Sequence, residues 1–176
     1  MGVFVFLRES MERNIRKWTS LLIAILCYYL IHEGSHLIFA LMYGAFEKIK
    51  IIFPGIQIVC NTDKMSNYQI AMFCLSGSFF SMTSGHILML LGKSVKKIDN
   101  KYILAISYYT TLVLLMSDPV YLSVLSSFVG GGDLNGIVLF GISEINVKII
   151  YGIIGCINLL LIVKIVYPCY KKYFIL

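Results

Sequence analysis

Four long apolar runs constrain this chain more than any other feature of its sequence. They lie at about residues 18–46, 67–91, 102–129 and 146–167, and most charged residues lie between them. A helix needs roughly 20 apolar residues to cross about 30 Å of hydrocarbon. The chain is 59% hydrophobic and 14% charged, whereas a soluble domain averages roughly a quarter charged. The sequence therefore predicts an all-α, multi-pass integral membrane protein with about four transmembrane helices, and we expect it in the cell membrane.

The first 17 residues differ from the apolar runs. They combine apolar side chains with Arg8, Arg13, Arg16 and Lys17, a mixture that suits a helix lying at the lipid headgroups. We find no internal repeat and no linker between domains. We therefore expect an interfacial segment, residues 1–17, followed by a single membrane-embedded domain, residues 18–176.

The segment between the first and second runs has a different composition. Residues 47–61 are rich in β-branched side chains and contain Pro54-Gly55, a pair that suits the centre of a type II turn. We predict a β-hairpin with strands near 48–53 and 56–60.

The third run contains two features that are unusual in a membrane helix. Pro119 follows Asp118, and its missing N–H and ring clash should break or kink the helix there. Further on, residues 130–136 read Gly-Gly-Gly-Asp-Leu-Asn-Gly. We expect these residues to be a flexible stretch, which is tolerated at membrane depth only when it is buried in protein or lines a wet cavity.

The first run carries a pattern of ionisable residues, His32-Glu33-Gly34-Ser35-His36. Helical positions i and i+4 share a face, so both imidazoles can point at a single ion. Zinc held by two histidines and one oxygen ligand keeps an open position for water, and a neighbouring carboxylate can take the proton of that water. The pattern therefore predicts His32 and His36 as metal ligands and Glu33 as the catalytic base. The competing interpretation is that both histidines hold helices together by hydrogen bonding.

A third ligand must come from elsewhere in the chain. Asp133 is the strongest candidate, because the three glycines before it let the backbone approach closely. Asp118 is a rival, although an Asp before Pro often only organises a helix break. Glu144 is a more distant alternative near the expected start of the last helix. His86 is expected to be a partner in helix packing.

Together these residues resemble the site-2 proteases, which are intramembrane zinc metalloproteases, and the resemblance covers roughly residues 18–140. It rests on the His-Glu-Gly-Ser-His pattern in a membrane helix, the hairpin after it, Gly77 and Ser81 as a Gly-x-x-x-Ser element, and the late aspartate beside glycine. The resemblance implies that His32, His36 and Asp133 bind zinc and that Glu33 is the base. The family's late motif, Asn-Pro followed soon by Leu-Asp-Gly, reads here as Asp118-Pro119 and, after a longer gap, Gly132-Asp133-Leu134.

The functional expectation is thus a metalloendopeptidase with one Zn²⁺ per chain. Its substrates would be transmembrane proteins or membrane-bound peptides, hydrolysed in or next to their membrane segments, and each would pair as an extended strand with the hairpin. The alternatives are a non-catalytic membrane protein that binds a metal or a partner, and a membrane zincin of another family that uses Glu144 as a ligand. No nucleic-acid partner is expected, because the positive charges sit at the ends of apolar runs rather than along one face.

The charges also bear on orientation. With four spans, ten Lys and Arg residues fall on the side of the termini and four fall on the other side, which favours both termini in the cytoplasm. That orientation places the hairpin and the histidines toward the outer face, whereas the family resemblance implies a site nearer the cytoplasm. The ten are Arg8, Arg13, Arg16, Lys17, Lys93, Lys96, Lys97, Lys101, Lys171 and Lys172, and the four are Lys48, Lys50, Lys64 and Lys148.

Overall fold

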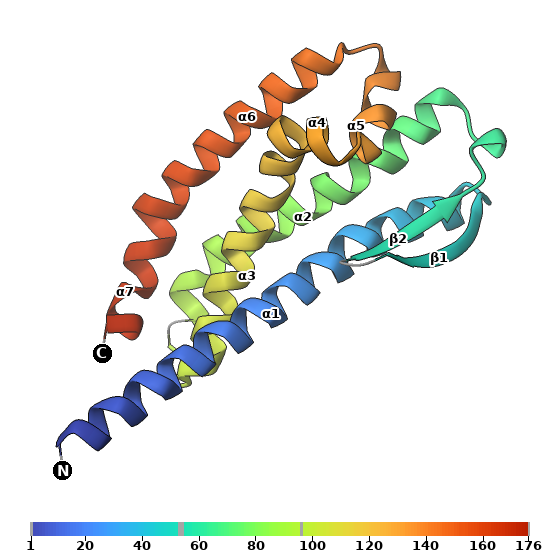
Figure 1. The fold of residues 1–176 in the computed structure, drawn as a ribbon. Coiled ribbons are helices and arrows are strands. Elements are labelled where there is room, and N and C mark those ends of the chain that lie inside the picture. The colour runs from blue at the N-terminus through green and yellow to red at the C-terminus, as the bar shows by residue number, and fades with distance from the viewer. Residues whose placement is uncertain (1, 53–54, 96, 176) are drawn as a thin grey trace.

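The computed structural model describes residues 2–52, 55–95 and 97–175 (Figure 1). Its elements are α1 (Gly2–Met42), β1 (Phe46–Ile52), β2 (Gly55–Cys60), η1 (Thr62–Lys64), α2 (Asn67–Val95), α3 (Lys101–Val120), η2 (Tyr121–Leu125), α4 (Ser126–Val129), α5 (Gly132–Ile137), η3 (Val138–Phe140), α6 (Glu144–Leu161), η4 (Ile162–Val166) and α7 (Tyr167–Ile175). Within the described residues, four helical stretches are long and apolar enough to span a membrane: Arg8–Met42, Asn67–Val95, Lys101–Val129 and Glu144–Lys171. The predicted fold class is confirmed.

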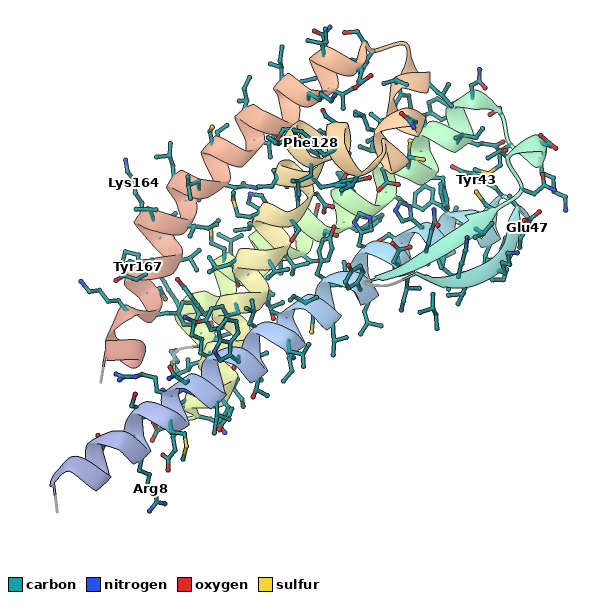
Figure 2. The ribbon with its side chains drawn as sticks, viewed as in Figure 1. Arg8, Tyr43, Glu47, Phe128, Lys164 and Tyr167 are labelled. Atoms are coloured by element: carbon teal, nitrogen blue, oxygen red, sulfur yellow. The ribbon has the colours of Figure 1, made fainter. Side chains whose placement is uncertain are left out.

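The outward faces of these helices suit lipid rather than water. Large apolar side chains such as Leu30, Leu90, Phe128 and Ile153 are exposed, and Figure 2 labels Phe128 on the short helix α4. An apolar patch of this extent has no place on a soluble monomer. The chain is therefore best described as a multi-pass membrane protein.

Helix α1 runs without a break from Gly2 to Met42. Residues 2–17 are thus continuous with the helix that carries the histidines and do not form a separate element. Their expected position at the headgroups stays a prediction.

The two strands form the predicted hairpin between α1 and α2. Strands β1 and β2 are antiparallel, with Lys48 opposite Val59 and Lys50 opposite Gln57. The first strand begins at Phe46, two residues before the predicted start. The predicted turn includes Pro54, which lies outside the described residues.

The sequence predicts a break or a kink at Pro119, and the structure shows that helix α3 does not break there. The helix continues to Val120 and then widens into the π-helical segment η2 before α4. In a regular helix the N–H of residue 119 would donate to the carbonyl of Leu115, and proline has no N–H. The side-chain amide of Asn158 on α6 donates to that carbonyl instead, at 2.7 Å. An interhelical hydrogen bond therefore replaces the missing one.

The helices pack with α3 at the centre, in contact with α1, α2 and α6. Small residues allow the close approach of α2 and α3: a Cβ built at Gly85 would lie 2.9 Å from Leu115 Cδ2 and 3.1 Å from Leu114 Cβ. The start of α1 and the end of α7 lie at one end of the molecule, and the hairpin and α5 lie at the other (Figure 1). The histidines, in the last third of α1, belong to the hairpin end.

Candidate metal centre

The two histidines of the α1 pattern point at a common position. His32 and His36 are one helical turn apart and are both buried. Their Nε2 atoms lie 3.2 Å from each other, and the two rings meet edge to face with centroids 4.8 Å apart. The helical spacing therefore brings together two nitrogen donors, as predicted from sequence.

Asp133 completes the group from a distant part of the chain. Its Oδ2 atom lies 3.2 Å from His32 Nε2 and 3.4 Å from His36 Nε2. The three donor atoms all lie within 4.8 Å of one another, and the group could hold a metal ion. Of the sequence candidates for the third ligand, Asp133 is the one that the structure brings to both Nε2 atoms.

The backbone before Asp133 depends on its glycines. Gly130 and Gly132 have φ angles of +96° and +29°, which L side chains rarely adopt. A Cβ at Gly132 would also lie 2.6 Å from the hydroxyl of Tyr121, and that hydroxyl donates to the Gly130 carbonyl at 3.1 Å. The stretch was expected to be flexible, but residues 132–137 form the short helix α5, with Asp133 in its first turn.

Helix α5 packs against α2. Gly136 lies so close to α2 that a Cβ there would overlap the side chain of Cys74. Leu134 and Ile137 are buried in the apolar cluster on the hairpin side of the molecule. This packing holds α5, the short helix that carries the Asp133 carboxylate, in place against α2.

Helix α2 also supplies the space beneath the histidines. A Cβ at Gly77 would lie 2.6 Å from His36 Nε2 and 2.7 Å from His32 Nε2. Because a real Cβ does not approach other atoms so closely, no other residue fits here without moving the two imidazoles. Gly77 belongs to the Gly-x-x-x-Ser element of the sequence, and in the structure it packs against the two imidazoles.

The second ring nitrogen of each histidine lies near an oxygen atom of another helix. His36 Nδ1 lies 2.8 Å from the carbonyl of Phe73, on α2. His32 Nδ1 lies 3.1 Å from Asp118 Oδ1, and the hydroxyl of Tyr28 donates to the same oxygen at 2.7 Å. Asp118 therefore contacts the opposite side of the His32 ring from Asp133, and its predicted role as a rival third ligand does not fit this geometry.

Glu33 lies beside the histidines and is tied to the hairpin. Its Oε2 atom accepts a hydrogen bond of 3.2 Å from the backbone N–H of Ile58, on β2. That N–H therefore points out of the hairpin and toward α1. The carboxylate is half-buried and lines the same cavity as His32, His36 and Asp133.

This cavity has a volume of about 1330 Å³ and extends from the hairpin into the space between the helices. Its wall combines the polar hairpin residues Lys48, Lys50 and Gln57 with apolar residues of α3 and α6 such as Leu112 and Leu159. A segment of another chain could thus contact the histidines, the hairpin and the apolar helices at once.

The chain matches no protein-family model, curated protein or solved structure.

The remaining sequence candidates lie apart from the centre. Glu144 is exposed at the start of α6 and pairs with Lys148. His86 on α2 contacts the carbonyl of Met82 in its own helix, at 2.7 Å. Neither residue lines the cavity of the metal centre.

Cys60, on β2, lines the cavity. Burial raises the pKa of its thiol, and the charge of Glu47 adds to that shift. The thiol is therefore kept neutral at neutral pH and is a poor metal ligand there, because metals bind the thiolate.

The sequence analysis did not single out Tyr28, whose hydroxyl donates to Asp118. The signal was its spacing, since Tyr28 precedes His32 by four residues and so shares its helix face.

Proposed function

We propose that this protein is an intramembrane zinc metalloprotease that hydrolyses peptide bonds in or next to the transmembrane segments of membrane-bound substrates. The observation that carries the proposal is the triangle formed by His32 Nε2, His36 Nε2 and Asp133 Oδ2. Its edges measure 3.2, 3.2 and 3.4 Å.

These edges favour zinc because of the shape of its coordination. Zinc sites are almost always tetrahedral, with bonds to histidine nitrogen and carboxylate oxygen of about 2.0–2.1 Å, so neighbouring ligand atoms should lie about 3.3–3.4 Å apart. The donor set also agrees with catalytic zinc, which uses three protein ligands and leaves a fourth position open. His32, His36 and Asp133 would hold the ion.

A zinc ion bound there would supply Lewis acidity, which activates water and polarises a carbonyl group. Glu33 would act as the general base and later as the general acid, carrying the proton to the leaving nitrogen. Its position supports this role, since it directly follows His32, precedes His36 by three residues and lines the same cavity. The amide of Ile58 holds the carboxylate on the cavity side of the hairpin.

The surroundings of the centre favour a membrane-bound substrate. The cavity joins apolar helical walls to the hairpin, so an unwound membrane segment could be accommodated with its backbone along the strands. An extended peptide commonly binds a sheet by adding a strand to its edge. We therefore assign the hairpin a substrate-binding role.

The test compares the membrane proteome after exposure to wild-type protein and to Glu33→Gln. Membranes are incubated with each purified full-length protein, and new peptide termini are identified by mass spectrometry. The wild type should create termini in or beside transmembrane segments, and Glu33→Gln should reduce that cleavage by about 10²- to 10⁴-fold while keeping its zinc. The matched control, Glu144→Gln, should cleave like the wild type.

If wild type and Glu33→Gln produced the same new peptide termini, with zinc present in both, the proposed protease activity would be wrong. The non-catalytic metal-binding protein would then be the better account.

A further inference from the structure

Asp118 is a carboxylate in an unusual place. It lies inside the membrane-spanning part of α3 and its side chain is fully buried. Ionisable groups in such positions are costly and are retained where they have a specific partner. Asp118 Oδ1 lies 3.1 Å from His32 Nδ1 and accepts a hydrogen bond of 2.7 Å from Tyr28 Oη. His32 Nδ1 and Asp118 Oδ2 are both buried and have no partner in hydrogen-bond geometry among the described residues.

We propose that Asp118, oriented by Tyr28, is a positioning residue that holds His32 in the tautomer required for metal binding. A proton on Nδ1, facing Asp118, leaves the lone pair of Nε2 free to face the metal position. A carboxylate in this role also raises the basicity of the imidazole ligand. The inference rests on the metal centre of the proposed function, although not on its peptidase activity.

The comparison of the two histidines supports this assignment. His36 Nδ1 faces the backbone carbonyl of Phe73, which is neutral, whereas His32 Nδ1 faces a carboxylate. Both arrangements orient Nε2 toward Asp133, but only that of His32 places a carboxyl group behind the ring. The centre is therefore built with two different supports, and we expect His32 to be the ligand whose strength depends on its partner.

The fold holds this carboxylate in position from two sides. Tyr28 lies one turn before His32 on α1, so one helix presents both groups to Asp118. On the other side, Asn158 fixes α3 through the Leu115 carbonyl, one turn before Asp118.

The experiment measures zinc affinity of the detergent-purified full-length chain by competition with a chromophoric chelator. Asp118→Asn keeps the shape and removes the charge, and it should weaken zinc binding by about 10- to 100-fold. Tyr28→Phe removes the orienting hydroxyl and should produce a smaller loss. Asp99→Asn and Tyr43→Phe are matched controls outside the centre and should bind zinc like the wild type.

Spectra of the cobalt-substituted proteins distinguish positioning from direct ligation. Asp118→Asn should keep the wild-type coordination number, whereas Asp133→Ala should change it. A change in Asp118→Asn like that in Asp133→Ala would make Asp118 a ligand and overturn the proposal. A zinc affinity of Asp118→Asn within a few-fold of wild type would also overturn it.

Folding controls accompany these measurements, and the results separate a failure of the Asp118 role from a failure of the protease. Helical circular dichroism and thermal unfolding verify that each variant is folded, and the conservative Asn variant decides the question where Asp118→Ala does not fold. If the wild type binds zinc but Glu33→Gln does not change cleavage, the proposed protease fails while the role of Asp118 stands. If Asp118→Asn binds zinc normally, the role of Asp118 fails while the protease stands.

Discussion

At the scale of single residues, Gly77 is a position where adding one methyl group should weaken zinc binding. Adding one methyl group in Gly77→Ala would place a Cβ within 2.7 Å of both Nε2 atoms, so the imidazoles must move apart. We expect zinc affinity to fall by about tenfold or more, as for other changes that misorient ligands. Chelator competition measures this.

Gly92→Ala is the control, because it lies on the same helix and its Cβ would meet its nearest atom at 3.6 Å, an ordinary contact. Normal zinc binding by Gly77→Ala would mean that the two histidines do not converge as described.

Several residues of the centre could be predicted from sequence because their signals are local. His32, Glu33 and His36 lie within five positions, and helical spacing alone places the two imidazoles on one face. Asp133 was favoured because glycines precede it. The contact of Asp118 with His32 Nδ1 could not be predicted, because it depends on how α3 packs against α1 at a separation of 86 residues.

At the scale of elements, the continuity of α3 through Pro119 depends on α6. Asn158 is buried and donates to the carbonyl that proline leaves without a partner. We expect Asn158→Leu to lower the free energy of unfolding by about 1–3 kcal/mol, the usual cost of a buried unpaired polar group. Equilibrium unfolding in mixed detergent measures it.

A double-mutant cycle tests whether the Asn158 amide replaces the hydrogen bond that Pro119 cannot donate. Pro119→Ala restores an N–H that can donate to the Leu115 carbonyl, so Asn158→Leu should cost much less in that background. Equal costs in both backgrounds would show that Asn158 does not replace the missing hydrogen bond.

The elements themselves were only partly predictable. The long helices and the hairpin follow from hydrophobic runs and β-branched residues, which are local properties. The short helix α5 does not, since a segment rich in glycine has low helical propensity. Its packing against Cys74 and the burial of Leu134 and Ile137 stabilise a helix that the local sequence does not favour.

At the scale of the whole molecule, the two ends of the long helices differ in the residues that they carry. Helix α1 has 41 residues and so extends about 60 Å, roughly twice the hydrocarbon thickness. Lys17 stacks over Trp18 and Lys171 over Tyr167, at 5.4 and 5.9 Å. Such aromatic and basic pairs are typical of the headgroup region, so we expect the membrane boundary near them, at the end that holds the termini.

The excess of basic residues at that end predicts that it faces the cytoplasm. Lys64→Cys, beside the hairpin, should then react with a membrane-impermeant thiol reagent from outside intact cells, whereas Asp99→Cys should react only after permeabilisation. The wild-type chain, with its own cysteines, provides the background. The reverse pattern of labelling would place the metal centre on the cytoplasmic side, as the resemblance to site-2 proteases implies.

The proposed function depends on one metal ion held by three residues that α1 and α5 bring together. The most direct measurement is the zinc content of the detergent-purified full-length protein, compared with that of His36→Ala, Asp133→Ala and Glu144→Gln. We predict about one zinc ion per chain in the wild type and in Glu144→Gln, as for a single mononuclear site, and little or none in the other two. A wild-type chain without zinc after incubation with the metal, or an Asp133→Ala variant that keeps it, would contradict the account.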